Sequence, residues 1–255
     1  MEETDPLALA HALLSARVSD NRHDRSENPE QPETVQAMQI ALHVPKTQPP
    51  RRTDLLEAAA RAVVAVCLSD RIAGEPSWRA GLEGWYDHLI RKVTRRARNK
   101  AWLDVQEVPG VTVDVRGAQA RAFVPSAVSA VPPPVRKLQI QGTELPPDET
   151  GPVEPGTPLI LVDRDLQMTT GKAAAQVGHA SMLLAAAQDL GWVRAWAARG
   201  FPLHVREVPH AEFAAYLGTP GVVTVRDAGY TEVAPDALTV LALPGDEAHL
   251  RGARP

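Results

Sequence analysis

Two polar segments contain the residues most able to do chemistry. In the first, residues 169–179, Lys172, Gln176 and His179 are spaced at i, i+4 and i+7. A helix with that spacing places the three side chains on one face. A lysine in the first turn, beside unpaired backbone N–H groups, suits a phosphate or a developing oxyanion. The alternative is a polar stripe that faces solvent.

The second segment, residues 227–239, begins with Asp227 directly after an apolar strand pattern. An acidic residue at that place either forms a turn through its side chain or serves a binding or catalytic site. Thr231 and Thr239 follow within the same segment, and their hydroxyls either bind water and substrate or support the loop. The two segments together predict a site that contains a carboxylate, a lysine and two hydroxyls.

Several other kinds of site and location are excluded by the sequence. It contains no HxxxH, HExxH, GxGxxG, P-loop or GxSxG pattern, and Cys67 is its one cysteine. We therefore expect no metal, no cofactor and no internal disulfide, and we predict a cytoplasmic protein. There is no run of 18 apolar residues for a membrane span, and the acidic start is unlike a secretory signal.

The elements that must position these residues are clearest over residues 158–243. Their order is strand, helix, helix, strand, helix, strand, strand, which is typical of an α/β fold with a small mixed sheet flanked by helices. Lys172 falls in the first turn of the first helix, with Thr169 or Thr170 as its cap. The apolar share of 44% and the charged share of 23% are those of a globular protein.

The chain also contains an internal repeat. Residues 115–129 align with residues 225–239 at an offset of 110 without a gap, with five identities in fifteen pairs. A strand, an Ala-rich helix and a Trp-bearing segment precede both stretches. We predict two tandem copies that form a pseudo-dimer, although two convergent Ala-rich segments would give the same pattern. In this alignment Asp227 and Thr231 correspond to Gly117 and Arg121, and a separate match of the Ala-rich helices sets Lys172 against Glu57. Only the second copy therefore keeps the polar set.

The predicted organisation has four parts. Residues 1–36 carry eight acidic side chains against three arginines, so this acidic flexible tail is −5 and the remaining chain is +1 of the total −4. Within it, Thr4 to Val18 could form a short amphipathic helix with Pro6 in its first turn. Residues 37–130 are the degenerate copy and residues 158–255 the catalytic domain. Between them, residues 131–157 form a proline-rich linker or wrapping arm. Six basic residues in residues 91–100 indicate either RNA contact or a solvated helix face.

The two polar segments together resemble the type 2 peptidyl-tRNA hydrolases of archaea and eukaryotes. The family pattern is an apolar strand, an Asp-Leu turn and then Gly-Lys-x-Ala-Ala-Gln-x-x-His-Ala, which stands here at residues 165–180. A second signature, Asp-Ala-Gly-x-Thr-x-x-x-Pro followed by Thr-Val, stands at residues 227–240. The resemblance covers about residues 157–245 and rests on two separate polar signatures in the right order.

This resemblance implies hydrolysis of the ester that joins a peptide to the 3′ ribose of tRNA. Asp227 would orient or deprotonate the water, and Lys172 would stabilise the oxyanion or a nearby phosphate. Thr231 and Thr239 would position water or substrate. Further candidates for substrate binding are Thr170, Gln176 and His179. The family tends to form homodimers, so we expect either a monomeric pseudo-dimer or a homodimer, with peptidyl-tRNA as its partner.

Two departures from the family pattern keep other functions open. The family usually has a second lysine where this chain has Thr170, and often a basic residue where it has Tyr230. Both changes remove positive charge, which favours as an alternative a non-catalytic tRNA-binding or regulatory protein on the same fold. A third possibility is an esterase or amidase that acts on small substrates.

Overall fold

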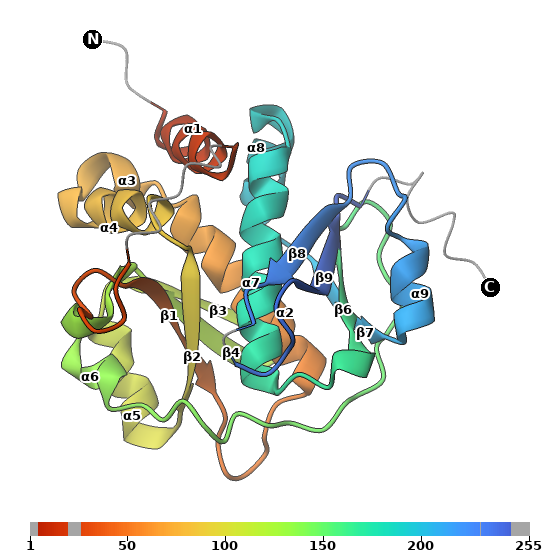
Figure 1. Ribbon diagram of the computed structural model, residues 1–255, viewed down its shortest axis with the longest axis horizontal. Coiled ribbons are helices and arrows are strands. Elements are labelled where there is room, and N and C mark those ends of the chain that lie inside the picture. The colour runs from red at the N-terminus through yellow and green to blue at the C-terminus, as the bar shows by residue number, and fades with distance from the viewer. Residues whose placement is uncertain (1–4, 20–26, 230, 246–255) are drawn as a thin grey trace.

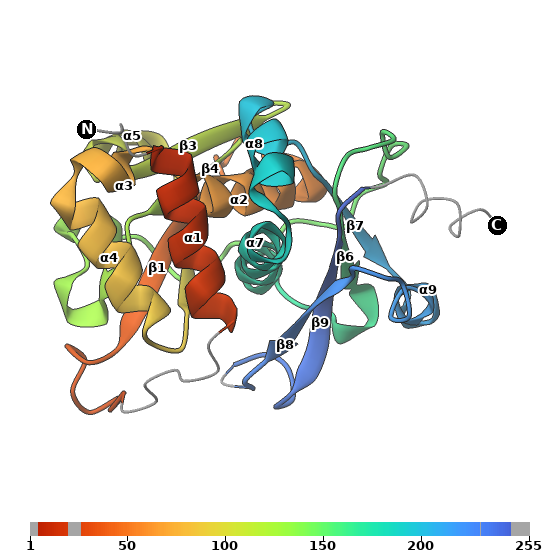
Figure 2. The ribbon, with the colours of Figure 1, turned by 90° about the horizontal axis from the view of Figure 1, so that it is seen from above.

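Two sheets stand on either side of two long helices, α2 (Arg52–Cys67) and α7 (Thr170–Ala187), which cross between them (Figures 1 and 2). The computed structural model describes residues 5–19, 27–229 and 231–245. None of the helices in these ranges combines the length and the apolar character that a membrane span requires. The predicted class, an α/β fold with small mixed sheets flanked by helices, is confirmed.

The first sheet has the strand order β2-β1-β4-β3. Strands β1 and β2 are parallel, whereas β4 is antiparallel to both β1 and β3. A short strand, β5, pairs with the beginning of β1. The bounds of these strands are Gln36–His43 for β1, Arg91–Ala97 for β2, Gly110–Val115 for β3, Ala118–Phe123 for β4 and Ser126–Ala127 for β5.

The second sheet has the strand order β7-β6-β9-β8. Strands β6 and β7 are parallel, and β9 is antiparallel to both β6 and β8. The predicted order of elements, β-α-α-β-α-β-β, is confirmed. The bounds are Leu159–Asp163 for β6, Leu190–Ala198 for α8, His204–Val208 for β7, His210–Ala215 for α9, Val223–Asp227 for β8 and Ala237–Leu243 for β9.

The two sheets have the same topology. When β1, β2, β3 and β4 are matched to β6, β7, β8 and β9, both the strand order and every relative direction agree. Helix α2 packs on β3 and β4 of its own half and reaches β7 of the other, and α7 likewise packs on β8 and β9 and reaches β2. This reciprocal layout is compatible with a tandem duplication.

The ungapped alignment of the two halves does not match the structure. Strands β3 and β4 are joined by Arg116 and Gly117 alone, whereas residues 228–236 join β8 to β9. Residues 118–123 therefore form a strand, while the residues 110 positions later lie mostly in a loop. Arg116 rather than Gly117 follows β3, and Asp54 stands as far into α2 as Lys172 stands into α7. The predicted correspondences of Asp227 and Thr231 were wrong because the longer loop requires a gap, and that of Lys172 with Glu57 was wrong because Glu57 lies further into its helix.

Both halves contribute to one hydrophobic core. Its largest cluster contains Ile40 and Leu56 from the first half together with Val177 and Val240 from the second. The helices approach closely at Gly178, where an added Cβ would lie 2.8 Å from a methyl carbon of Val63 on α2. Small side chains along both helices therefore allow the halves to pack directly on each other.

The predicted acidic tail is not a tail along its whole length. Helix α1 (Pro6–Ser19) packs against α7, and its Ala10 and Leu14 are fully buried. His11 Nε2 lies 3.1 Å from the carbonyl oxygen of Ala185 near the end of α7. The apolar side chains of this helix pack against the rest of the protein. The acidic net charge of residues 1–36 gave no sign of this packing. Residues 1–4 and 20–26 of this segment lie outside the described residues.

The basic stretch forms the edge strand β2, so the prediction of a helix face was wrong. It pairs with β1 along its full length. The proline-rich linker wraps around this edge, where Gln139 forms an isolated bridge with Arg96, and continues toward α7. The first half also contains α3 (Arg71–Gly74), α4 (Pro76–Tyr86) and α5 (Asn99–Asp104), and the linker contains α6 (Pro133–Arg136).

Candidate active site

The first turn of α7 is held by a side-chain cap. Thr169 precedes the helix, and its Oγ1 accepts a hydrogen bond of 3.1 Å from the backbone N–H of Lys172. The predicted capping by a threonine is therefore confirmed. Gly171 leaves no room for a side chain, because a Cβ there would lie 2.7 Å from Thr143 Oγ1 and 2.8 Å from Thr94 Oγ1. The linker and β2 thus fix the position of this turn.

Asp227 is the last residue of β8, at the point where the chain leaves the sheet. Its Oδ1 accepts a hydrogen bond of 2.8 Å from the N–H of Gly229. Its backbone carbonyl accepts one of 2.8 Å from Asp236 N, which closes the loop of residues 228–236. Gly229 has φ +79°, a conformation that favours glycine, and Pro235 packs directly against it. The loop is therefore folded back over the end of the strand.

The structure brings four of the predicted site residues together. Lys172 Nζ lies 2.5 Å from Asp227 Oδ2 and 3.0 Å from Thr231 Oγ1. Gln176 Nε2 donates to the same Asp227 Oδ2 at 2.6 Å. The Asp227 side chain is 9% exposed and that of Lys172 is 12% exposed. The carboxylate is therefore largely screened from water but still reachable.

Thr239 lies behind this network. Its side chain is fully buried, and its Oγ1 lies 2.8 Å from Gln176 Oε1 and 3.2 Å from the carbonyl oxygen of Val225. Because its hydroxyl donates to the amide oxygen of Gln176, the amide nitrogen is turned toward Asp227. Thr239 thus fixes the orientation of a neighbour and does not face solvent.

The other two predicted substrate-binding residues are Thr170 and His179. Thr170 is fully buried, and its Oγ1 accepts hydrogen bonds from Arg52 Nη1 at 2.7 Å and from Leu145 N at 2.9 Å. Its hydroxyl therefore joins the second half to the first half and the linker. His179 is partly exposed on α7, three residues beyond Gln176. Tyr230 lies outside the described residues.

Sequence reasoning missed Glu232 and Arg52. The carboxylate of Glu232 accepts hydrogen bonds from Thr169 N at 2.8 Å and from Thr169 Oγ1 at 2.7 Å. Arg52 comes from the other half and forms a two-pronged ion pair with Glu207, at 2.6 and 2.7 Å. Glu232 stands at a variable position of the family signature, and Arg52 is the first residue of α2, directly after a proline-rich loop. Neither therefore carried a signal in the sequence.

The charges at the start of α7 bear on what can bind there. Lys172 provides one positive charge, while Asp227 and Glu232 provide two negative charges. The protein's own carboxylates therefore occupy the positions where sequence reasoning predicted an anion. A phosphate group at this place would meet a net negative environment.

A second charged pair lies at the same edge of the second sheet. Asp163, which is buried at the end of β6, accepts a hydrogen bond of 2.6 Å from Nδ1 of the exposed His210. This bond and the nearby carboxylate charge raise the pKa of the His210 imidazole. Strand β9 separates β6 from β8, so the pair is about 10 Å from Asp227. Among the described residues, no three His, Cys, Asp or Glu side chains form a cluster that could hold a metal.

The fold and the network define an α/β unit with a carboxylate, an ammonium and an amide gathered at the end of a strand, an arrangement suited to activating water. Comparison with protein families finds a match for this unit. Residues 158–251 match the family model described as Peptidyl-tRNA hydrolase PTH2. The resemblance of the C-terminal half that the two polar signatures indicated is therefore confirmed.

Proposed function

We propose that the protein hydrolyses peptidyl-tRNA. The observation that carries this proposal is that Lys172 and Gln176 both donate hydrogen bonds to Asp227. In the reaction, water adds to the ester carbonyl carbon and the bond to the ribose 3′ oxygen breaks. One water proton passes to that oxygen, and the other is released from the new carboxylic acid. The family match of residues 158–251 supports this substrate class.

Asp227 orients the attacking water. A carboxylate oxygen accepts about two hydrogen bonds. Among the described residues, Lys172 and Gln176 fill Oδ2, while Gly229 takes one position on Oδ1. Oδ1 therefore keeps one lone pair for a water. Asp227 thus serves as an acceptor that holds the water in position for attack.

Lys172 stabilises the oxyanion that forms during attack. Its ammonium has three N–H groups, of which Asp227 and Thr231 accept two among the described residues. The third is available to the carbonyl oxygen as it gains negative charge, where a preorganised donor has its largest effect. The Thr231 hydroxyl, an acceptor toward Lys172, retains its own hydrogen for the substrate.

Gln176 and Thr239 act as positioning residues, since each holds its neighbour and neither is exposed. His179 is the remaining candidate for a substrate contact on this face of α7. Thr170 accepts a hydrogen bond from Arg52 and so links the two halves.

The proposal is tested by release of peptide from N-acylaminoacyl-tRNA. Asp227→Asn and Lys172→Met should each lower kcat by about 100-fold or more, because they remove the water-orienting acceptor and the oxyanion donor. Asp236→Asn is the matched control, since Asp236 lies in the same loop, is exposed and pairs only with Arg226 among the described residues. Full activity of Asp227→Asn would overturn the proposed mechanism.

The alternative, a non-catalytic tRNA-binding or regulatory protein on this fold, is favoured by Glu232. Its carboxylate closes the loop onto the first turn of α7 and adds negative charge beside Lys172. A folded wild-type protein that binds tRNA but releases no peptide would establish this alternative.

We also propose that the chain works as a monomeric pseudo-dimer in which residues 37–130 are the inactive half. The matching topology of the sheets and the reciprocal packing of α2 and α7 support this proposal. Sedimentation at micromolar concentration should give the mass of one chain. An obligate homodimer formed through the C-terminal half would contradict it.

A further inference from the structure

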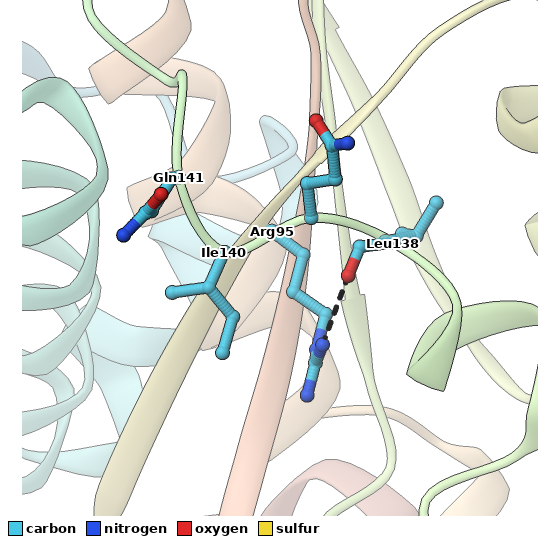
Figure 3. A pocket seen from close by; sticks show the side chains of 5 residues that line it. Arg95, Leu138, Ile140 and Gln141 are labelled. Atoms are coloured by element: carbon cyan, nitrogen blue, oxygen red, sulfur yellow. Dashed lines mark hydrogen bonds between the residues drawn. The ribbon is translucent and has the colours of Figure 1, made fainter.

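A bay of about 560 Å³ lies between the edge strand β2 and the linker. Its lining residues are Arg95, Leu138, Gln139, Ile140 and Gln141. In Figure 3, Gln141 and Leu138 stand on opposite sides of the bay, with Ile140 and Arg95 between them. Neither the first half nor the linker falls within the stretch that matches the family, so nothing in that match explains this bay.

The bay has a strongly basic surrounding. The two segments that flank it, residues 91–100 and 131–143, contain eight Lys and Arg residues and no Asp or Glu. The side-chain nitrogen of Lys92 is buried, and Arg91 and Lys100 pair with Glu27 and Asp104, so the positive charge that remains is that of Arg95, Arg96, Arg98, Arg136 and Lys137. Arg95 donates from Nε to Gln39 Oε1 at 2.7 Å and from Nη1 to the carbonyl of Leu138 at 3.1 Å. A guanidinium has five N–H groups, so these bonds fix the side chain and leave donors for a ligand. A polyanion is therefore the expected occupant.

The walls of the bay offer an exposed apolar side chain and hydrogen-bonding groups. Gln139 and Gln141 are exposed. The amide oxygen of Gln139 accepts a hydrogen bond from Arg96, which leaves its NH₂ group as a donor, and the amide of Gln141 can both donate and accept. Ile140 is 57% exposed, which is unusual for a large apolar side chain in this protein. Proteins hold single-stranded nucleic acid in positively charged grooves where bases stack on planar groups and hydrogen bonds reach the base edges, and in this bay the guanidinium of Arg95 is the planar group.

The linker that lines the bay also contacts the candidate active site. Two residues after Gln141, Thr143 Oγ1 accepts a hydrogen bond of 3.1 Å from the backbone N–H of Gly171. Gly171 directly precedes Lys172, and two residues of chain span at most about 7 Å. The linker is therefore a shared rim, with the bay on one side and the first turn of α7 on the other.

The start of α7 and the bay differ in the sign of their charge. The start of α7 has a net negative charge, which disfavours a phosphate, whereas the neighbouring bay is basic. We propose that the bay binds the single-stranded 3′ end of the RNA, so that the last nucleotides lie along β2 and the linker while the ester reaches Lys172 and Asp227. This inference rests on the proposed function, and it assigns part of the substrate site to the half that lacks the catalytic residues.

The test places a negative charge in the bay. Ile140→Glu should raise KM for N-acylaminoacyl-tRNA about five- to tenfold, with kcat unchanged, because it repels phosphates without touching the catalytic network. The same variant should hydrolyse an N-acylaminoacyl ester of adenosine alone as the wild type does. Leu103→Glu is the matched control, because Leu103 is a similarly exposed apolar residue, on α5 and outside the bay lining.

A second variant measures the charge contribution. Arg95→Gln should weaken binding of deacylated tRNA and reduce the dependence of log Kd on log salt by about one phosphate contact. This readout needs no turnover, so it separates failure of the bay from failure of catalysis. If no variant releases peptide but Ile140→Glu still weakens tRNA binding, the bay stands and the proposed activity falls.

Two results would overturn the inference. One is an equal KM for Ile140→Glu and Leu103→Glu with tRNA substrates. The other is an effect of Ile140→Glu that depends on peptide length and not on the RNA, because the peptide would then be the occupant.

Discussion

Asp227 and Arg116 stand at the carboxyl ends of corresponding strands, β8 and β3, and each forms an ion pair with the long helix of its own half. Asp227 pairs with Lys172 on α7, whereas Arg116 pairs with both Asp54 and Glu57 on α2. The geometry is thus kept in both halves while the charges are reversed. With a cation in place of the carboxylate, the first half has no group at this position that could orient water.

Thr239→Val should lower kcat about tenfold and leave KM nearly unchanged. The valine keeps the shape of the side chain but removes the hydroxyl that holds Gln176 Oε1, so the amide no longer keeps its nitrogen on Asp227. Thr239→Ser retains the hydroxyl and should restore turnover. Steady-state kinetics of both variants give the comparison, and equal losses in the two would refute the positioning role.

Gly229→Ala should damage the catalytic loop more than the fold as a whole. At φ +79°, an alanine Cβ would lie 2.5 Å from the backbone of Pro235, so the turn that donates to Asp227 Oδ1 must shift. We expect a strain of about 1–3 kcal/mol and a loss of activity of tenfold or more. Gly218→Ala is the control, because a Cβ there has no neighbour within 4 Å. Peptide release and thermal unfolding of both variants should separate them.

Arg52→Met should destabilise the chain by about 3–5 kcal/mol, because it leaves Glu207 largely buried without its cation. The neighbouring Arg51 is half-exposed, and its pair with Asp148 is more open to solvent, so Arg51→Met should cost at most about 1 kcal/mol. Urea denaturation measures both losses. The double variant Arg52→Met with Glu207→Leu should recover part of the stability, and similar losses for the two single variants would show that the buried pair contributes little.

Stability should rise between pH 7 and pH 9 because of Lys92. Burial lowers the pKa of the Lys92 ammonium to about 7, and its nitrogen lies 4.9 Å from the ring centre of Trp85 on α4 with no hydrogen-bond partner among the described residues. Between these pH values Lys92 binds a proton in the unfolded chain but not in the folded chain. The free energy of unfolding therefore falls as pH falls from about 10 toward 7. The slope is about 1.4 kcal/mol per pH unit.

Two other groups face Lys92 and limit this window. Burial raises the pKa of the Cys67 thiol on α2 to about 11, and it also raises the pKa of the Tyr86 hydroxyl on α4. Their folded forms resist losing a proton, so above about pH 9 they oppose the gain from Lys92. Denaturation of Lys92→Met at pH 7, 8 and 9 should show a flat profile relative to wild type, whereas Lys46→Met, which changes an exposed lysine, should keep the wild-type slope.

The sequence was sufficient for the second half because its signals were local. Periodicity and turn residues predicted each element from β6 to β9, and the helical spacing of Lys172 and Gln176 placed both on the face that meets Asp227. The prediction worked because a helix first turn and a strand end are defined by neighbouring residues, and the family signatures joined them.

The rest depended on contacts between distant residues. Arg52 reaches Thr170 across 118 positions, and Thr143 reaches Gly171 from a proline-rich segment without periodicity. The ungapped repeat misled the alignment because identical residues such as Pro125 and Pro235 lie in a different relation to their strands. Glu232 escaped notice because its role requires the loop to fold back onto Thr169.

The packing of α2 against α7 has a consequence for how the protein responds to dilution. An assembly of two separate chains comes apart as concentration falls, whereas two helices in one polypeptide meet at an effective concentration set by the segment that connects them. The rim formed by Thr143 against Gly171 is therefore preserved at any dilution. The fused arrangement also lets one half change its residues without imposing the same change on the other.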